Sequence, residues 1–198
     1  MASARKACLG LAALVAVGLL VMCSGCGLQT DEANQAMAKA TKSQQEAEAV
    51  LARLRNFPAE WQAVFSLPYG PDQIARARQL LVDREADVET FTAALATWKA
   101  DMKPILKLDV DDKIKEYVKL KIGSIVCYAE YAKDYLRPIF KAYGGLVEEI
   151  AYGRPQAELD RSASEITELV KESSAKLEEC SATQKQAEDY FQESRIGK

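Results

Sequence analysis

Apolar residues recur at gaps of three and four along nearly the whole chain after residue 30, which is the spacing of amphipathic helices. No segment of the sequence shows the strict alternation, bounded by turn residues, that indicates a β-strand. Alanine, glutamate, lysine, glutamine and leucine, all good helix formers, dominate the same region. Glycine and proline gather at a few points and divide the chain into four long helices, so the pattern predicts an all-α protein.

The clearest helical pattern runs from Pro71 to about Lys103. Apolar residues stand there at strict seven-residue intervals, namely Ile74, Leu81, Val88, Leu95 and Met102. The companion positions hold Ala77, Phe91 and Trp98, with Arg84 as the one polar residue among them. A sustained seven-residue spacing predicts left-handed, coiled-coil-like packing against neighbouring helices.

The first and third helices have thinner or interrupted patterns. The first begins after Thr30, a suitable N-cap, and its stripe of alanine and glutamine buries little area. A short aromatic helix follows near Pro58, before a turn at residues 67–71. The third helix begins after residue 112; Pro138 predicts a kink, Gly144-Gly145 a break, and residues 153–155 a second stop.

The fourth helix extends from about Pro155 to Glu193, and Ser162 with Glu165 offers a second start with capping-box spacing. Short connections favour antiparallel neighbours, so we expect an elongated antiparallel four-helix bundle. The alternative is a shorter bundle whose first and last helices project as a coiled-coil pair. Polar residues in the stripes, namely Arg84, Ser173 and Gln184, either set the helix register or mark where a seam opens to solvent.

The N-terminus has the organisation of an export signal. Arg5 and Lys6 precede a stretch of 14 uncharged residues, 9–22. A membrane-spanning helix needs roughly 20 apolar residues, whereas a secretory signal uses about 7–15. The stretch therefore predicts a cleaved signal peptide.

The segment Cys23-Ser24-Gly25-Cys26 resembles the cleavage region of bacterial lipoproteins that have a type II signal peptide. The resemblance implies cleavage between Gly25 and Cys26 and a thioether-linked diacylglycerol on Cys26. Cys23 departs from the aliphatic residue usual at its position, and an ordinary cut after Gly25 also satisfies the small-residue rule. The expected organisation is a signal peptide at 1–25, a lipidated cysteine with a short tether at 26–30, and a bundle domain at 31–198.

Composition and charge narrow the classes of function. The chain has 26 basic and 29 acidic residues, and loss of Arg5 and Lys6 with the signal changes the formal net charge from −3 to −5. Such acidity predicts that the protein has no nucleic-acid partner and no basic cluster that binds anionic lipid. Acyl chains would therefore provide the membrane attachment. The sequence contains no histidine, which removes Ser-His-Asp, Cys-His and histidine-containing metal sites.

Few side chains suggest chemistry. With Cys26 lipidated, Cys127 and Cys180 are the two remaining cysteines of the mature chain, in an oxidising compartment. They form either a disulfide or two independent small residues. The helical spacing places Cys127 off the core stripe. Four tyrosines form a flank on the third helix: Tyr117, Tyr128, Tyr131 and Tyr135. We expect them to be half-buried against a neighbouring helix with their hydroxyls in water, or else to stack on a ligand or a partner protein. The carboxylates are expected to cap helices or to be solvated: Asp109, Asp111, Asp112, Glu148, Glu149, Glu178 and Glu179.

These observations favour a non-catalytic, membrane-anchored lipoprotein of the cell envelope that acts as a structural or adaptor module through a protein partner. We expect no cofactor and no enzymatic activity. Glycine at position 27 favours the outer membrane if the envelope is Gram-negative. The alternative is a helical lipoprotein that holds a small molecule or lipid near Phe91, Trp98 and the tyrosine flank.

Overall fold

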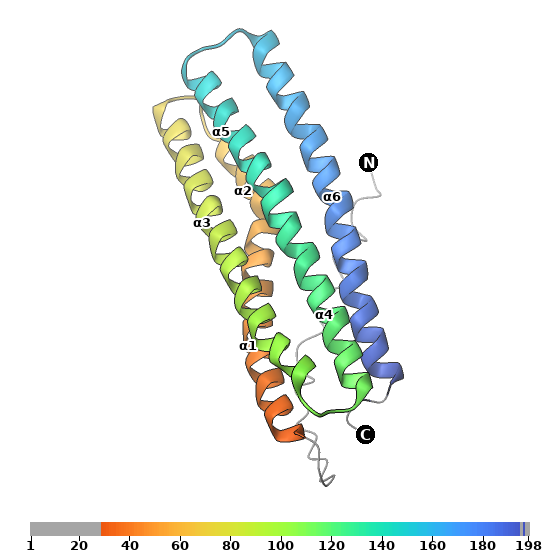
Figure 1. Ribbon diagram of the computed structural model, residues 1–198. Coiled ribbons are helices and arrows are strands. Elements are labelled where there is room, and N and C mark those ends of the chain that lie inside the picture. Colours follow the sequence, from red (N-terminus) through yellow and green to blue (C-terminus); the bar gives the residue numbers. More distant parts are fainter. Residues whose placement is uncertain (1–28, 195, 197–198) are drawn as a thin grey trace, which may run out of the picture.

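The computed structural model describes residues 29–194 and residue 196, and nearly all of them are helical. Four rods run along one long axis and alternate in direction (Figure 1). The elements are α1 (Thr30–Arg55), α2 (Phe57–Phe65), α3 (Pro71–Met102), the 3₁₀ helix η1 (Lys103–Lys107), α4 (Asp112–Tyr131), the π-helix η2 (Ala132–Leu136), α5 (Arg137–Ala151) and α6 (Gln156–Glu193). Along the chain, the first rod is α1 with α2, the second is α3, the third is α4 with η2 and α5, and the fourth is α6. The predicted all-α four-helix bundle is confirmed.

Each helix packs against a particular set of neighbouring helices. α1 packs along α3, α3 also contacts α4 and α5, and α6 lies against α4, η2 and α5. Within the described part of the chain α1 and α6 do not pack together, although Gln184 Nε2 donates a 3.5 Å hydrogen bond to Glu48 Oε1. Both helices follow the bundle along its length, so they do not project as the coiled-coil pair that was the alternative (Figure 1).

Large apolar side chains fill the interior. Several of the large ones are each at most 2% exposed, among them Phe91 and Leu95 of α3, Val118 and Ile125 of α4, and Phe140 of α5. The seven-residue stripe of α3 is buried throughout, from Ile74 to Met102. Burial of this stripe follows from its spacing, because a seven-residue repeat keeps one face of the helix toward its neighbours.

The alanine-rich stripe of α1 lies against α3. Ala33, Ala40 and Ala47 are 2–3% exposed, and small side chains allow the two helices to approach closely. Between them, Ser43 Oγ donates a 2.7 Å hydrogen bond to Asp101 Oδ2 of α3. The weak apolar pattern of α1 is therefore a packed face and not an unpartnered one.

The start of α1 differs from the prediction by one residue. Gln29 is the N-cap, and Thr30 is the first helical residue. The Gln29 carbonyl accepts the Ala33 amide at 3.2 Å, while the Gln29 side chain bonds to Asp109 in the α3–α4 connection. A contact with a residue 80 positions away thus places the helix start, which local capping preferences do not reveal.

The third rod is more continuous than predicted. The π-helix η2 ends at Leu136, two residues before Pro138, and lies where a kink was expected; a wider turn there suits a proline that lacks an N–H donor. The expected break at Gly144-Gly145 is wrong, because α5 continues through both glycines to Ala151. Phe140 and Val147, which are 2% and 0% exposed, anchor the helix on either side of them. Their burial outweighs the cost of about 1 kcal/mol for each glycine.

The second predicted stop is confirmed at Gly153, which has a positive φ of 66°. The Gly153 amide donates to Ile150 O at 3.1 Å, and the Arg154 amide donates to Glu149 O at 3.0 Å. Glycine suits this left-handed position because it has no Cβ. α6 then begins at Gln156, so the alternative start at Ser162 is not used.

Candidate functional site

The lipidation site Cys26 and its cleavage partner Gly25 lie outside the described residues, so both stay predictions. The described chain begins three residues later, at Gln29. The Gln29 amide donates to Asp109 O at 2.9 Å, and Gln29 Oε1 accepts the Asp109 amide at 3.0 Å. This reciprocal pair of hydrogen bonds joins the start of α1 to the α3–α4 connection.

Cys127 and Cys180 form a disulfide that joins α4 to α6, with Cα atoms 5.4 Å apart. The expectation that Cys127 lies off the core stripe is wrong, because its side chain is only 5% exposed. The reason is that α4 is covered on two faces, one by α3 and the other by α6. The disulfide is therefore part of the interior that α6 closes.

The tyrosine flank occupies the same covered face. Tyr128 and Tyr131 are 4% and 5% exposed, so the expected half-burial with wet hydroxyls is wrong for these two. Tyr128 Oη donates to Gln184 Oε1 at 3.1 Å, and Ser173 Oγ donates to Tyr131 Oη at 3.5 Å. Ser173 and Gln184 thus pair with tyrosines in the α4–α6 seam. That these residues set the helix register stays a prediction.

Burial also changes the acidity of the tyrosines. Desolvation raises the pKa of Tyr131 and Tyr143, and it raises that of Tyr117 together with a smaller contribution from the nearby charge of Glu188. A raised pKa keeps a phenol protonated at neutral pH. These hydroxyls therefore suit hydrogen bonding and not proton abstraction.

Lys121 is a buried residue that our reading of the sequence did not single out. Its side chain is 3% exposed, and Nζ lies 3.3 Å from Glu188 Oε1 of α6. The same ammonium lies 5.8 Å from the ring centroid of Trp98 and 5.9 Å from that of Tyr117. The cluster joins α3, α4 and α6 by an ion pair and cation–π contacts. Its sequence signal is the position of Lys121, three residues after the buried Val118.

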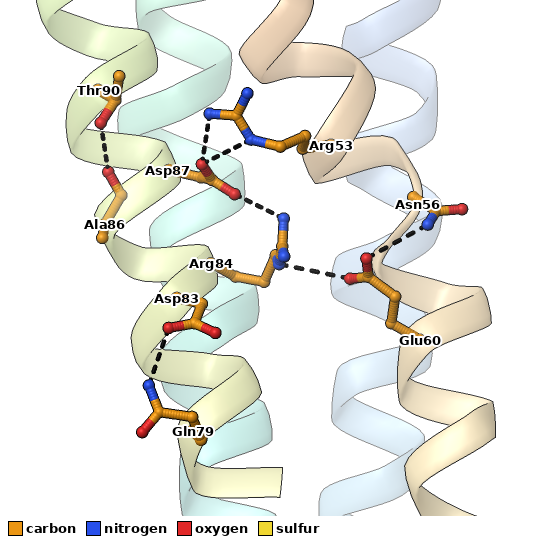
Figure 2. Close-up of polar contacts among 9 residues, drawn as sticks. All are labelled: Arg53, Asn56, Glu60, Gln79, Asp83, Arg84, Ala86, Asp87 and Thr90. Carbon is orange, nitrogen blue, oxygen red and sulfur yellow. Dashed lines mark hydrogen bonds and ion pairs between the residues drawn. The ribbon is translucent and has the colours of Figure 1, made fainter. Parts of the chain in front are cut away.

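Arg84, the polar residue in the α3 stripe, forms a charged cluster that spans three helices (Figure 2). Its guanidinium donates to Asp87, and Nε lies 3.4 Å from Glu60 Oε2 of α2 without hydrogen-bond geometry. Arg53 of α1 donates to Asp87 Oδ1 through Nε and Nη2, at 3.0 and 2.8 Å. Asn56, between α1 and α2, donates to Glu60 at 3.2 Å. The cluster holds the α1–α2 bend against α3.

Two of the acidic candidates, Asp111 and Glu148, have clear structural roles. Asp111 caps α4, since its side chain accepts the Lys113 amide at 2.8 Å, as expected for this stretch. Arg78 donates to both oxygens of Glu148, at 2.8 and 2.7 Å, and holds the pKa of that exposed carboxyl below its usual value. No group of three or more potential metal ligands occurs among the described residues. Asp111 therefore caps a helix and Glu148 forms a surface ion pair, whereas Glu149 Oε2 is buried without a hydrogen-bond partner.

The residues expected to line a ligand site are packed inside the protein. Phe91 is 1% exposed and Trp98 is 3% exposed; Phe91 meets Tyr128 edge-on, with ring centroids 6.3 Å apart. Two open, shallow depressions lie elsewhere, on the surface of α6. One follows residues 164–172, and the other lies between Leu120 of α4 and the end of α6.

Comparison with known proteins gives no relative. No protein-family model matches the chain, and no curated protein or solved structure is significantly similar to it. Among the described residues, none of the helices combines the length and the apolar character needed to cross a bilayer.

Proposed function

We propose that the protein is a non-catalytic lipoprotein of the cell envelope, anchored through acyl chains on Cys26, that acts as a structural or adaptor module. The observation that supports this most is the use made of its polar side chains. The polar groups of Arg84, Lys121 and Tyr128 each contact a side chain on a neighbouring helix. Such contacts support a fixed body that presents its surface to a protein partner.

The anchor is proposed from the sequence and agrees with the charge of the body. The segment Ser24-Gly25-Cys26 has the small residues and the cysteine that lipoprotein processing requires. An acidic body has little electrostatic attraction to anionic lipid, so membrane attachment depends on acyl chains. The protein then works outside the cytoplasm, at the outer membrane if the envelope is Gram-negative.

Metabolic labelling with a fatty-acid analogue in the native host tests the anchor. We expect the wild type to be labelled and Cys26→Ala to be unlabelled and to accumulate as the precursor. Cys23→Ala is the matched control, because it removes a neighbouring thiol and leaves the acceptor in place. Labelling that persists on Cys26→Ala would falsify the assignment.

The adaptor role needs its own measurement. Cross-linking in intact cells, followed by purification from membranes, should recover the same envelope protein in a defined ratio. The control is Cys26→Ala, which retains the bundle but loses the anchor, and recovery should fall with it. Recovery of a small molecule in stoichiometric amount, without a protein, would overturn the adaptor role and support the ligand-binding alternative.

A further inference from the structure

The two ends of the bundle differ in what they carry. The start of α1, η1, the rest of the α3–α4 connection and the end of α6 lie at one end, and the connections at 66–70 and 152–155 lie at the other (Figure 1). At the first end, Lys113 Nζ donates to Ser194 O at 3.5 Å, which joins the start of α4 to the end of α6. We call this first end, formed by Gln29 and residues 103–113, the anchored face.

Chain length decides which end lies near the lipid. Cys26 precedes Gln29 by three residues, and three residues span at most about 10 Å. α6 has 38 residues, and a helix of that length extends about 57 Å. An acyl group on Cys26 therefore reaches the anchored face, and the opposite end lies several times farther away.

The two hydrogen bonds between Gln29 and Asp109 fix the start of α1 relative to the rest of the anchored face. They hold the start of α1 on the α3–α4 connection, at 2.9 and 3.0 Å. Without them, the first turn of α1 could separate from that connection and the body could turn about the tether. With them, Gln29, three residues after the lipid attachment point, is held on the anchored face.

The side chains of the anchored face suit phospholipid headgroups. Lys103, Lys107 and Lys113 are exposed, and long lysine stems can lie along an interface while their ammonium groups stay hydrated. Asp109 and Asp111 are also exposed, so the face carries both signs of charge. This balance fits a surface that rests among headgroups and is held there by the anchor, without insertion into the hydrocarbon.

We propose that the anchored face rests on the bilayer surface and that the bundle stands with its long axis away from the membrane. This inference rests on the proposed anchor at Cys26. The connections at 66–70 and 152–155 are then the most distant part of the body. They carry two large exposed apolar side chains, Tyr69 and Tyr152, which are 73% and 79% exposed.

The orientation can be measured without relying on lipidation in the cell. The mature chain from Cys26 onward, with its disulfide intact, has one free thiol, which couples to vesicles of phosphatidylcholine that contain a maleimide lipid. A fluorescent donor is placed on a non-natural amino acid at Lys107 or at Tyr69, both exposed. Energy transfer to an acceptor lipid should be at least fivefold more efficient from position 107. Equal transfer from the two positions would overturn the proposal.

Variants of Gln29 test the role of its two hydrogen bonds with Asp109, which we call the clamp. Gln29→Ala removes the hydrogen bond that the side chain accepts, and Gln29→Pro removes both, because proline has neither that side-chain carbonyl nor an amide N–H. The difference in energy-transfer efficiency between donors at positions 107 and 69 should shrink in that order. Gln45→Ala, a change at an exposed position of α1, should leave this difference unchanged. Circular dichroism confirms that each variant is folded. An unchanged difference in Gln29→Pro would show that the clamp does not hold the orientation.

The outcomes separate this inference from the function on which it rests. If fatty-acid labelling fails but coupled protein stands upright, the anchor is wrong and the geometry of the anchored face holds. If labelling succeeds and the two donor positions give equal transfer, the anchor stands and the upright orientation is wrong.

Discussion

Arg84 and Asp87 lie one turn apart on α3 and form an ion pair in which each side chain is 13% exposed. Arg53 of α1 and Glu60 of α2 extend the pair into a cluster that crosses three helices (Figure 2). A charged residue in a seven-residue stripe is thereby explained as the link between the α1–α2 bend and α3. Its contribution to stability can be measured directly.

Replacement of Arg84 by alanine should lower the free energy of unfolding by about 1–3 kcal/mol, because it leaves the partly buried Asp87 and Glu60 with fewer partners. Arg76→Ala, at an exposed position of the same helix, is the control and should change it by less than about 0.5 kcal/mol. Urea unfolding followed by circular dichroism measures both. Equal effects of the two changes would show that the cluster adds no stability.

Removal of the disulfide should destabilise the protein without changing its helix content. The bond joins residues 53 positions apart, and the double change Cys127→Ala, Cys180→Ala should cost about 2–4 kcal/mol. Protection of amide hydrogens from exchange should fall most in α6, which packs only on α4, η2 and α5 among the described elements. A uniform fall across all helices would contradict a specific role in holding α6.

The hydrogen bond between Tyr128 and Gln184 is expected to stabilise the packing of α6 on α4. Tyr128→Phe keeps the ring but leaves Gln184 Oε1 without this donor, and it should cost about 1 kcal/mol. Tyr152→Phe removes a hydroxyl from a side chain that is 79% exposed and should be nearly neutral. Thermal unfolding of both variants against the wild type gives the comparison. A Tyr128→Phe variant as stable as the wild type would mean that water replaces the bond.

The buried tyrosines predict a loss of stability at alkaline pH. Their pKa values are raised in the folded protein, so the folded state keeps protons that the unfolded state releases above about pH 10. The stabilisation is complete below that pH and declines as the pH rises further. Guanidinium unfolding at pH 8 and pH 10.5 should show the decline, and Tyr117→Phe should reduce it. A pH-independent stability would contradict the buried, protonated phenols.

The glycine pair inside α5 predicts a stabilising change. Beyond the backbone of α5 itself and the adjacent residues, nothing lies within 4 Å of the Cβ position at Gly144 or Gly145, so alanine fits at both. The double change should raise the free energy of unfolding by about 1–2 kcal/mol, because glycine is a poor residue inside a helix. Gly153→Ala is the opposite control, since its φ of 66° is strained for alanine. A fall in melting temperature for the double variant would contradict a continuous α5.

The helical stripes of α3 could be read from the sequence because each residue acts through its position on its own helix. The same holds for the stop at Gly153, where the chain needs a residue that adopts positive φ. The break expected at Gly144-Gly145 failed because local propensity was read without the burial of Phe140 and Val147. Packing against distant elements outweighed the weak helix preference of glycine.

The sequence by itself determined the all-α class and the four rods, because periodicity and composition act locally along the chain. Only the tertiary structure decided that α6 covers a second face of α4. That cover buries Cys127, Tyr128 and Lys121, whose partners lie 53, 56 and 67 positions away. One helical period reveals one apolar face, and a second face that is sealed by small and polar side chains is visible only when the neighbouring helix is in place.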